Sequence, residues 1–209
     1  MLSKDSLNYI ESKTKSYVSD WLNEEANINF DSKEIGHKHG EEVESYVVSR
    51  FVSEDIRFSE PEGSREFGDL YFDNNGVKEF INIKFGFQKK GQPNMGSGNR
   101  FINYLHNDKI DSYWVLSINL LDDSKNFQVH IFDIYKNLEL IHYDNGTGQF
   151  MLKENIFYGG TYKVNENILE KKVIMMKLKT IYDKGVDSLI ERRIKQKKSK
   201  EILFSCYEN

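Results

Sequence analysis

The chain has 209 residues, 38% of them hydrophobic and 13% aromatic, so it can bury the core of one full domain. Its formal net charge of −4 excludes a general nucleic-acid coating protein, although it leaves room for a local positive cleft. The single cysteine, Cys206, excludes an internal disulfide framework and a cysteine-based zinc site. No apolar run reaches transmembrane length and no apolar signal core follows the first residues, so we expect a cytoplasmic protein.

Two amphipathic helices are predicted in the first quarter of the chain. The first covers residues 3–23, and it either caps the core or serves a dimer interface. The second lies within residues 36–51, where Val43, Val47 and Phe51 recur close to helical spacing. Its start carries two glutamates, which form either a solvated acidic helix start favoured by the helix dipole or part of a functional site.

A β-hairpin with three polar side chains is the most informative segment of the chain. Two strand-like runs, residues 68–72 and 79–85, flank Asn74-Asn75-Gly76, which is a strong turn signal. Because side chains alternate along a strand, Asn82 and Lys84 share one face, and the hairpin can place Asp69 opposite them. We therefore expect a carboxylate beside an ammonium group.

Residues 85–104 follow the lysine-bearing strand and contain no Asp or Glu. They form either an ordinary surface loop or a loop that contacts DNA, since lysine and arginine neutralise phosphates and amide side chains can hydrogen-bond to base edges. The candidate DNA-binding residues are Gln88, Lys89, Lys90, Gln92, Asn94, Asn99, Arg100 and Asn103.

The remaining chain predicts further strands and two closing helices. Residues 112–121 and 127–134 read as central strands, and a third short strand is expected at 138–142. Asn165 can cap a helix from Glu166 to about Lys184, which Gly185 then breaks. The basic stretch 186–200 is either a DNA-facing helix or a frayed, solvated tail. Together these elements predict one α/β domain over residues 1–209, with the helices at 3–23 and 165–200 as additions to the core.

The hairpin resembles the core of the PD-(D/E)XK nuclease superfamily, which includes type II restriction endonucleases. Asp69 matches the first acid of that pattern, and Asn82-Ile83-Lys84 matches its acid-x-Lys element, with an amide where the family usually has a carboxylate. Gly68 stands where the family pattern has proline. The string Gly-Thr-Gly-Gln-Phe-Met-Leu-Lys at 146–153 is also similar to a late segment of restriction enzymes of the SwaI type.

The resemblance implies a central mixed β-sheet flanked by helices and a set of catalytic residues. It implies that Asp69, a glutamate from the second helix, Asn82 and the carbonyl oxygen of Ile83 hold one or two Mg²⁺ ions, while Lys84 activates water. Glu42 is the glutamate that we match, and Glu41 is the second choice.

The expected function is therefore Mg²⁺-dependent, site-specific cleavage of double-stranded DNA by a type II restriction endonuclease. A homodimer would place one active site on each DNA strand, and the resemblance also implies a cognate DNA methyltransferase as partner. Two alternatives remain: a repair or recombination nuclease that recognises DNA structure, and a non-catalytic DNA-binding module in which Asn82 marks a degenerate metal site.

Overall fold

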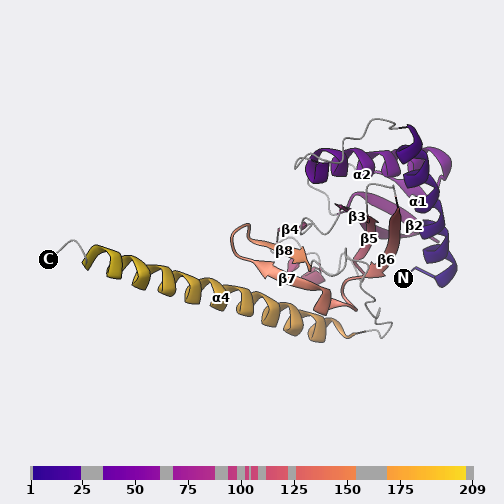
Figure 1. Ribbon diagram of the computed structural model, residues 1–209. Helices are drawn as coiled ribbons and strands as arrows, with labels where there is room; N and C mark the ends of the chain where they lie inside the picture. The colour runs from indigo at the N-terminus through magenta and orange to yellow at the C-terminus, as the bar shows by residue number, and fades with distance from the viewer. Residues whose placement is uncertain are drawn as a thin grey trace.

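The computed structural model describes residues 2–24, 35–61, 68–87, 94–97, 102–103, 105–107, 112–121, 126–153 and 169–205. A mixed five-stranded sheet forms its centre, with the strand order β1-β2-β3-β5-β6 (Figure 1). β3 and β5 are parallel, and the other neighbouring strands are antiparallel. The α/β class with a mixed sheet flanked by helices is confirmed. The strands are bounded as follows: β1 Phe58–Ser59, β2 Leu70–Asn74, β3 Val77–Phe87, β5 Trp114–Leu120 and β6 Phe127–Asp133.

The predicted hairpin joins β2 to β3 and is confirmed. Asn74 pairs with Val77, so Asn75 and Gly76 form a two-residue turn, and both have the positive φ (55° and 84°) that such a turn requires. The carboxylate of Asp73 accepts a hydrogen bond from Gly76 N at 2.6 Å. This turn sets the register of the strand that carries Asn82 and Lys84.

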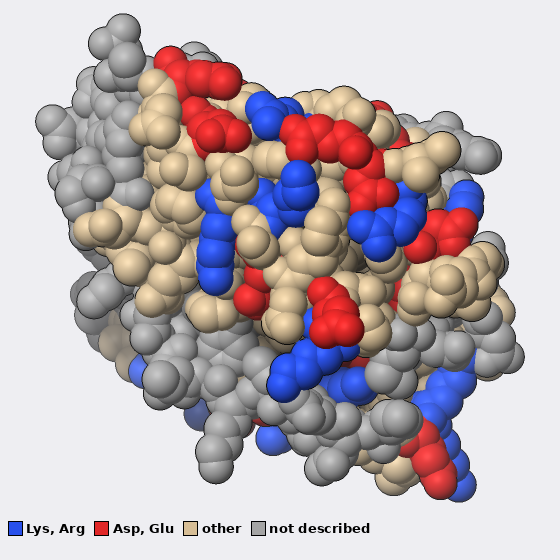
Figure 2. All heavy atoms as spheres, turned by 90° about the vertical axis from the view of Figure 1, so that its right-hand side faces the viewer, with Lys and Arg blue, Asp and Glu red and all other residues tan. Residues whose placement is uncertain are grey.

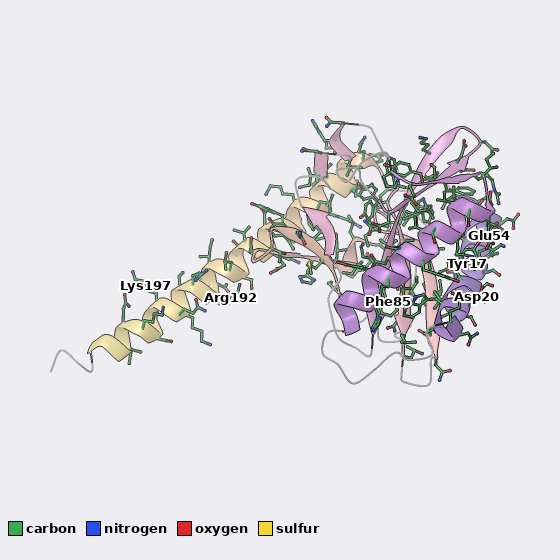
Figure 3. The ribbon with its side chains drawn as sticks, turned by 90° about the horizontal axis from the view of Figure 1, so that it is seen from above. Tyr17, Asp20, Glu54, Phe85, Arg192 and Lys197 are labelled. Carbon is green, nitrogen blue, oxygen red and sulfur yellow. The ribbon has the colours of Figure 1, made fainter. Side chains whose placement is uncertain are left out.

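Two helices cover one face of the sheet, α1 (Lys4–Glu24) and α2 (Ile35–Glu54). α1 confirms the first predicted helix and packs into the core, with Ile10, Tyr17 and Trp21 buried. Tyr17 packs edge-on against Phe51 of α2, and its hydroxyl donates to Glu54 at 2.9 Å. Figure 3 labels Tyr17 and Glu54 at this junction between the two helices.

The opposite face of the sheet packs against a second, three-stranded sheet of order β4-β8-β7 and against α4. Its strands are β4 Asn94–Ser97, β7 Ile141–Asp144 and β8 Gln149–Leu152. A short 3-10 helix, η1 (Leu138–Leu140), precedes β7. Buried side chains from both layers, including Tyr113, Phe132, Phe150 and Leu178, form one continuous apolar cluster.

The last helix, α4 (Lys171–Ser205), packs along β7 with its first half and extends away from both sheets with its second half (Figure 1). Ile174 and Leu178 are buried, and Tyr182 packs on Tyr143 with ring centroids 4.7 Å apart. From residue 190 onward, every α4 side chain that the structure describes is exposed.

Four sequence-based expectations need correction. The stretch 127–134 is an edge strand rather than a central one, because β6 pairs only with β5 in its sheet. Residues 138–140 form η1, and the strand after it belongs to the second sheet. The expected loop at 85–104 includes the end of β3 and the whole of β4. Finally, α4 begins at Lys171 and continues through Gly185, while the predicted cap at Asn165 lies outside the described residues.

Candidate active site

Asp69 lies immediately before β2, at the point where the pairing of β2 with β3 ends. The preceding Gly68 has φ of +107°, and a Cβ there would lie 3.3 Å from the Ile81 carbonyl oxygen. Asp69 N donates to that same oxygen at 3.0 Å. The local backbone therefore requires glycine at position 68, because other residues rarely adopt this positive φ.

Beyond Asp69, no strand among the described residues pairs with the edge of β3 that faces β2, and two carboxylates bind the amides of this edge. Asp69 Oδ2 accepts a hydrogen bond from Ile83 N at 2.7 Å, and Glu44 Oε1 accepts one from Phe85 N at 3.1 Å. Amides of alternate residues point to the same side of a strand. The two carboxylates consequently follow one another along this open edge, on either side of residue 84.

Lys84 points to Asp69, as the sequence predicts. Its Nζ lies 3.4 Å from Asp69 Oδ2, the same oxygen that Ile83 N contacts. The lysine side chain is 13% exposed and the aspartate side chain 35%. An ammonium group is thus held beside a carboxylate in a partly buried setting, where their interaction is screened less than at an open surface.

Asn82 lies on the same face as Lys84, and its amide nitrogen donates to Tyr113 Oη at 2.6 Å. Its Oδ1 is buried, and no described residue donates a hydrogen bond to it. Tyr113 is fully buried, and its pKa is well above the usual tyrosine value because of burial and the nearby Asp69 charge. The neutral Tyr113 hydroxyl therefore binds the nitrogen of the Asn82 side chain, and the side-chain oxygen Oδ1 of Asn82 remains available as an acceptor.

The glutamate that α2 brings to this cluster is Glu44, which the sequence analysis did not select. The pKa of Glu44 is raised to about 7, chiefly by burial and also by the Asp69 and Glu41 charges, whereas the Lys84 cation and the Phe85 amide oppose the shift. Glu42 instead pairs with His39, with 2.7 Å between Oε2 and Nδ1, and its side chain is 44% exposed. Glu41 is exposed on the same helix.

The helical pattern of α2 contained the signal for Glu44. Gly40 packs on Phe85, where a Cβ would lie 3.7 Å from the ring, and Val43 and Val47 are buried. Glu44 is four residues after Gly40 and three before Val47, so it borders the buried face of the helix. Glu42 lies on the opposite side of α2 from this buried face. Figure 3 labels Phe85 beside α2.

β5 contributes a further polar group that the sequence analysis did not single out. Ser117 pairs with Lys84 in the parallel register and is 1% exposed. Within the part of the chain that the structure describes, its Oγ has no hydrogen-bond partner. Because directly paired residues of neighbouring strands share a face, Ser117 belongs to the same polar stripe as Asn82 and Lys84.

Most of the predicted DNA-binding residues are not placed by the structure. Gln88, Lys89, Lys90, Gln92, Asn99 and Arg100 lie outside the described residues. Asn94 begins β4 and pairs with Met151 of β8. Asn103 is exposed, and its carbonyl oxygen accepts a hydrogen bond from Asn107 N.

The donor set of the cluster fits a Mg²⁺ ion. It offers the carboxylates of Asp69 and Glu44, the Asn82 Oδ1 that has no partner, and the Ile83 carbonyl oxygen, and Mg²⁺ prefers oxygen ligands. Among the described residues, no three His, Cys, Asp or Glu side chains gather closely enough to hold a metal by themselves. An ion here would therefore need the amide or the backbone oxygen as well.

This chain has similar proteins among solved structures. No protein-family model matches the chain, and no curated protein matches its sequence. Among solved structures, the NlaIV restriction endonuclease is similar over 75% of this chain and 76% of its own, with 11% identity and a TM-score of 0.44. Within the described residues, no helix combines the length and apolar character that a membrane crossing requires.

Proposed function

We propose that this protein is a Mg²⁺-dependent endonuclease that hydrolyses phosphodiester bonds of double-stranded DNA, as type II restriction enzymes do. The observation that carries the proposal is the convergence of Asp69, Lys84 and Glu44 on the open edge of β3. These are two carboxylates bound to the amides of residues 83 and 85, with the Lys84 ammonium 3.4 Å from one of them. The proposal also includes the PD-(D/E)XK relationship, with Glu44 in place of Glu42.

In the proposed reaction, Asp69, Glu44, Asn82 Oδ1 and the Ile83 carbonyl oxygen would hold Mg²⁺. When bound there, the ion would supply Lewis-acid stabilisation of the phosphate charge and a lowered pKa of coordinated water. Lys84 lies beside this oxygen set, where its ammonium group orients the attacking water and offsets negative charge that develops on the phosphate oxygens. Asp69 positions Lys84 through their 3.4 Å contact.

The proposed enzyme acts as a homodimer. Two antiparallel DNA strands require two active sites for a double-strand cut, so a two-fold homodimer acting on a palindromic site fits best. A methyltransferase that protects the same site would be its partner in the cell.

Replacement of Lys84 by Ala tests the proposal directly. We expect plasmid cleavage in Mg²⁺ to fall by about 100-fold or more, a typical effect of removing a group that stabilises charge in the transition state, while DNA binding persists. Lys78→Ala is the matched control, since Lys78 is an exposed lysine on the same strand, near the hairpin turn. Discrete product bands from the wild type indicate sequence-specific cleavage, and a smear indicates structure-directed or non-specific cleavage. Unchanged turnover in Lys84→Ala would remove this residue from the mechanism.

One observation favours a second candidate function, a DNA-binding module without catalysis. Asn82 carries no negative charge, and its amide is committed to Tyr113. The site therefore has one carboxylate fewer than the family pattern, which weakens attraction for a divalent cation. A gel shift of duplex DNA, together with no cleavage in either Mg²⁺ or Mn²⁺, would support this candidate over the nuclease.

A further inference from the structure

The charge of this protein is strongly divided between α4 and the rest of the chain. α4 carries eleven Lys and Arg and four Asp and Glu, a net charge of +7. Since the whole chain has −4, the remainder carries −11. A DNA duplex would be repelled by most of the protein and attracted by this one helix.

The positive charge is concentrated in the part of α4 that leaves the body. Residues 192–200 contain six bases and no acid, and all nine side chains are exposed. Figure 3 labels Arg192 and Lys197 on this projecting part. We call residues 192–200 the basic arm; its bases are Arg192, Arg193, Lys195, Lys197, Lys198 and Lys200.

Several bases on the body of the protein pair with neighbouring acids, unlike most bases of the arm. Arg50 pairs with Glu54 at 2.7 Å, Lys13 contacts Glu54 at 3.2 Å, and Arg57 pairs with Asp55 at 2.6 Å. Figure 2 accordingly shows red and blue side chains interspersed on the face that α1 and α2 cover. On the arm, Lys197 lies 3.7 Å from Glu201, and the described part of the chain offers the other five bases no ion-pair partner.

The spacing within the arm also indicates a polyanionic partner. Arg193, Lys197 and Lys200 follow one another at i, i+4 and i+7, so they lie on one side of the helix and repel each other. At about 1.5 Å per residue, the three side chains cover roughly 10 Å along the helix axis, which is comparable to the length occupied by a few successive phosphates of one DNA strand. Phosphate contacts would convert this repulsion into attraction.

We propose that the basic arm of α4 binds the phosphate backbone of duplex DNA, outside the cluster around Asp69 and Lys84. This inference rests on the proposed function and names the surface that supplies its non-specific DNA affinity. A second copy of this chain is the competing occupant, because exposed Ile190 and Ile194 lie along the same helix. A helix pair would bring two sets of like charges together, however, which disfavours pairing between two arms.

The test compares a triple variant of the arm with a matched control. Arg193→Gln, Lys197→Gln and Lys200→Gln remove three charges and keep good helix formers. Lys4→Gln, Lys15→Gln and Lys78→Gln remove three charges from exposed positions on the body. Binding to a fluorescent duplex is measured by anisotropy without divalent cation, over a range of salt concentrations, and circular dichroism checks that each variant folds.

We expect the arm variant to reduce the slope of log K against log salt by about 2 to 3, since each lost phosphate contact contributes about 0.9. Affinity at about 0.1 M salt should fall at least tenfold, and the control should stay close to wild type. Equal losses in both variants, or unchanged slopes in both, would overturn the proposal. So would a dimer-to-monomer change in sedimentation of the arm variant with its slope unaltered, because the arm would then bind a second copy.

The outcome separates this inference from the nuclease proposal. If the wild type cuts plasmid DNA and the arm variant binds with an unchanged salt slope, the nuclease proposal is supported and the arm proposal is wrong. If the arm variant has a reduced slope but the wild type cuts no DNA, the arm proposal is supported and the nuclease proposal is wrong. A wild type that binds no duplex at low salt overturns both.

Discussion

At Asn82 the chemistry of the candidate site depends on a single atom. The side chain offers an amide where a carboxylate would strengthen cation binding, and Tyr113 Oη accepts a hydrogen bond from its nitrogen. Its Oδ1 is buried and accepts no hydrogen bond from a described residue, so this oxygen is free to coordinate a cation. The type of residue at 82 therefore affects metal affinity more directly than it affects the fold.

Replacement of Asn82 by Asp should lower the Mg²⁺ concentration needed for half-maximal cleavage by about tenfold. The added charge strengthens cation binding, and Tyr113 can rotate its hydroxyl to donate to the new oxygen. A Mg²⁺ titration of plasmid cleavage measures the shift. Asn74→Asp, at the start of the hairpin turn, is the control. A variant that needs as much Mg²⁺ as the wild type, or more, would show that residue 82 is not a ligand.

Sequence and structure agree best at individual residues of the hairpin. The contact between Asp69 and Lys84 could be predicted because the strand period and the Asn-Gly turn are local properties. The choice of Glu44 over Glu42 could not be made in the same way, since it depends on which side of α2 meets Phe85. That contact joins residues 45 positions apart, from Gly40 to Phe85.

At the scale of elements, α4 shows how packing overrides local propensity. Gly185 is a typical helix-ending residue, yet α4 runs through it. The reason is the approach of β7: a Cβ at residue 185 would lie 2.6 Å from the Tyr143 carbonyl oxygen and 3.2 Å from its Cβ. Glycine is present because the helix and the strand touch there.

Substitution of Gly185 by Ala should destabilise the protein by about 1 kcal/mol. Alanine gains about 1 kcal/mol of helix propensity, but overpacking against the Tyr143 backbone costs about 1 to 3 kcal/mol. Urea unfolding measures the difference. Ser188→Ala, at an exposed position one turn later, is expected to stay within about 0.5 kcal/mol of wild type. A more stable Gly185→Ala protein would contradict the packing of α4 on β7.

Edge strands show the same dependence on distant partners. β6 is at the edge of the main sheet, and Glu11 of α1 accepts a hydrogen bond from its Ile131 amide at 2.9 Å. Asp69 and Glu44 satisfy the exposed amides of β3 in the same way. Carboxylates from neighbouring segments thus complete the edges of this sheet, which limits pairing with other chains.

At the scale of the whole molecule, two apolar clusters share the main sheet, one on each face. Asp133, 3% exposed at the end of β6, connects the neighbouring segments, because its Oδ1 accepts hydrogen bonds from Tyr113 N and Tyr135 N. Burial raises the pKa of Asp133 to about 6, although both backbone amides and Lys136 oppose the shift.

The raised pKa predicts a pH-dependent effect of Asp133→Asn on global stability. The folded state holds the Asp133 proton more tightly than the unfolded state, so this contribution is full below about pH 4 and is lost as pH rises through 6. Asparagine has no such proton. Relative to wild type, the variant should therefore gain about 3 kcal/mol between pH 4 and pH 8, from a shift of about two pKa units. Urea unfolding at both pH values measures this gain.

Asp187→Asn, at an exposed position on α4, provides the reference for the loss of a carboxylate from the surface. If Asp133→Asn loses stability between pH 4 and pH 8 relative to wild type, the raised pKa of Asp133 is wrong.

Local signals in the chain were enough for the α/β class, for α1, for the hairpin and for the contact of Asp69 with Lys84, because turn chemistry and side-chain periodicity act over a few neighbouring residues. The strand order, the second sheet, the passage of α4 through Gly185 and the position of Glu44 depend on contacts between segments far apart in the chain. Such contacts are selected by packing and burial, which no short stretch of residues contains.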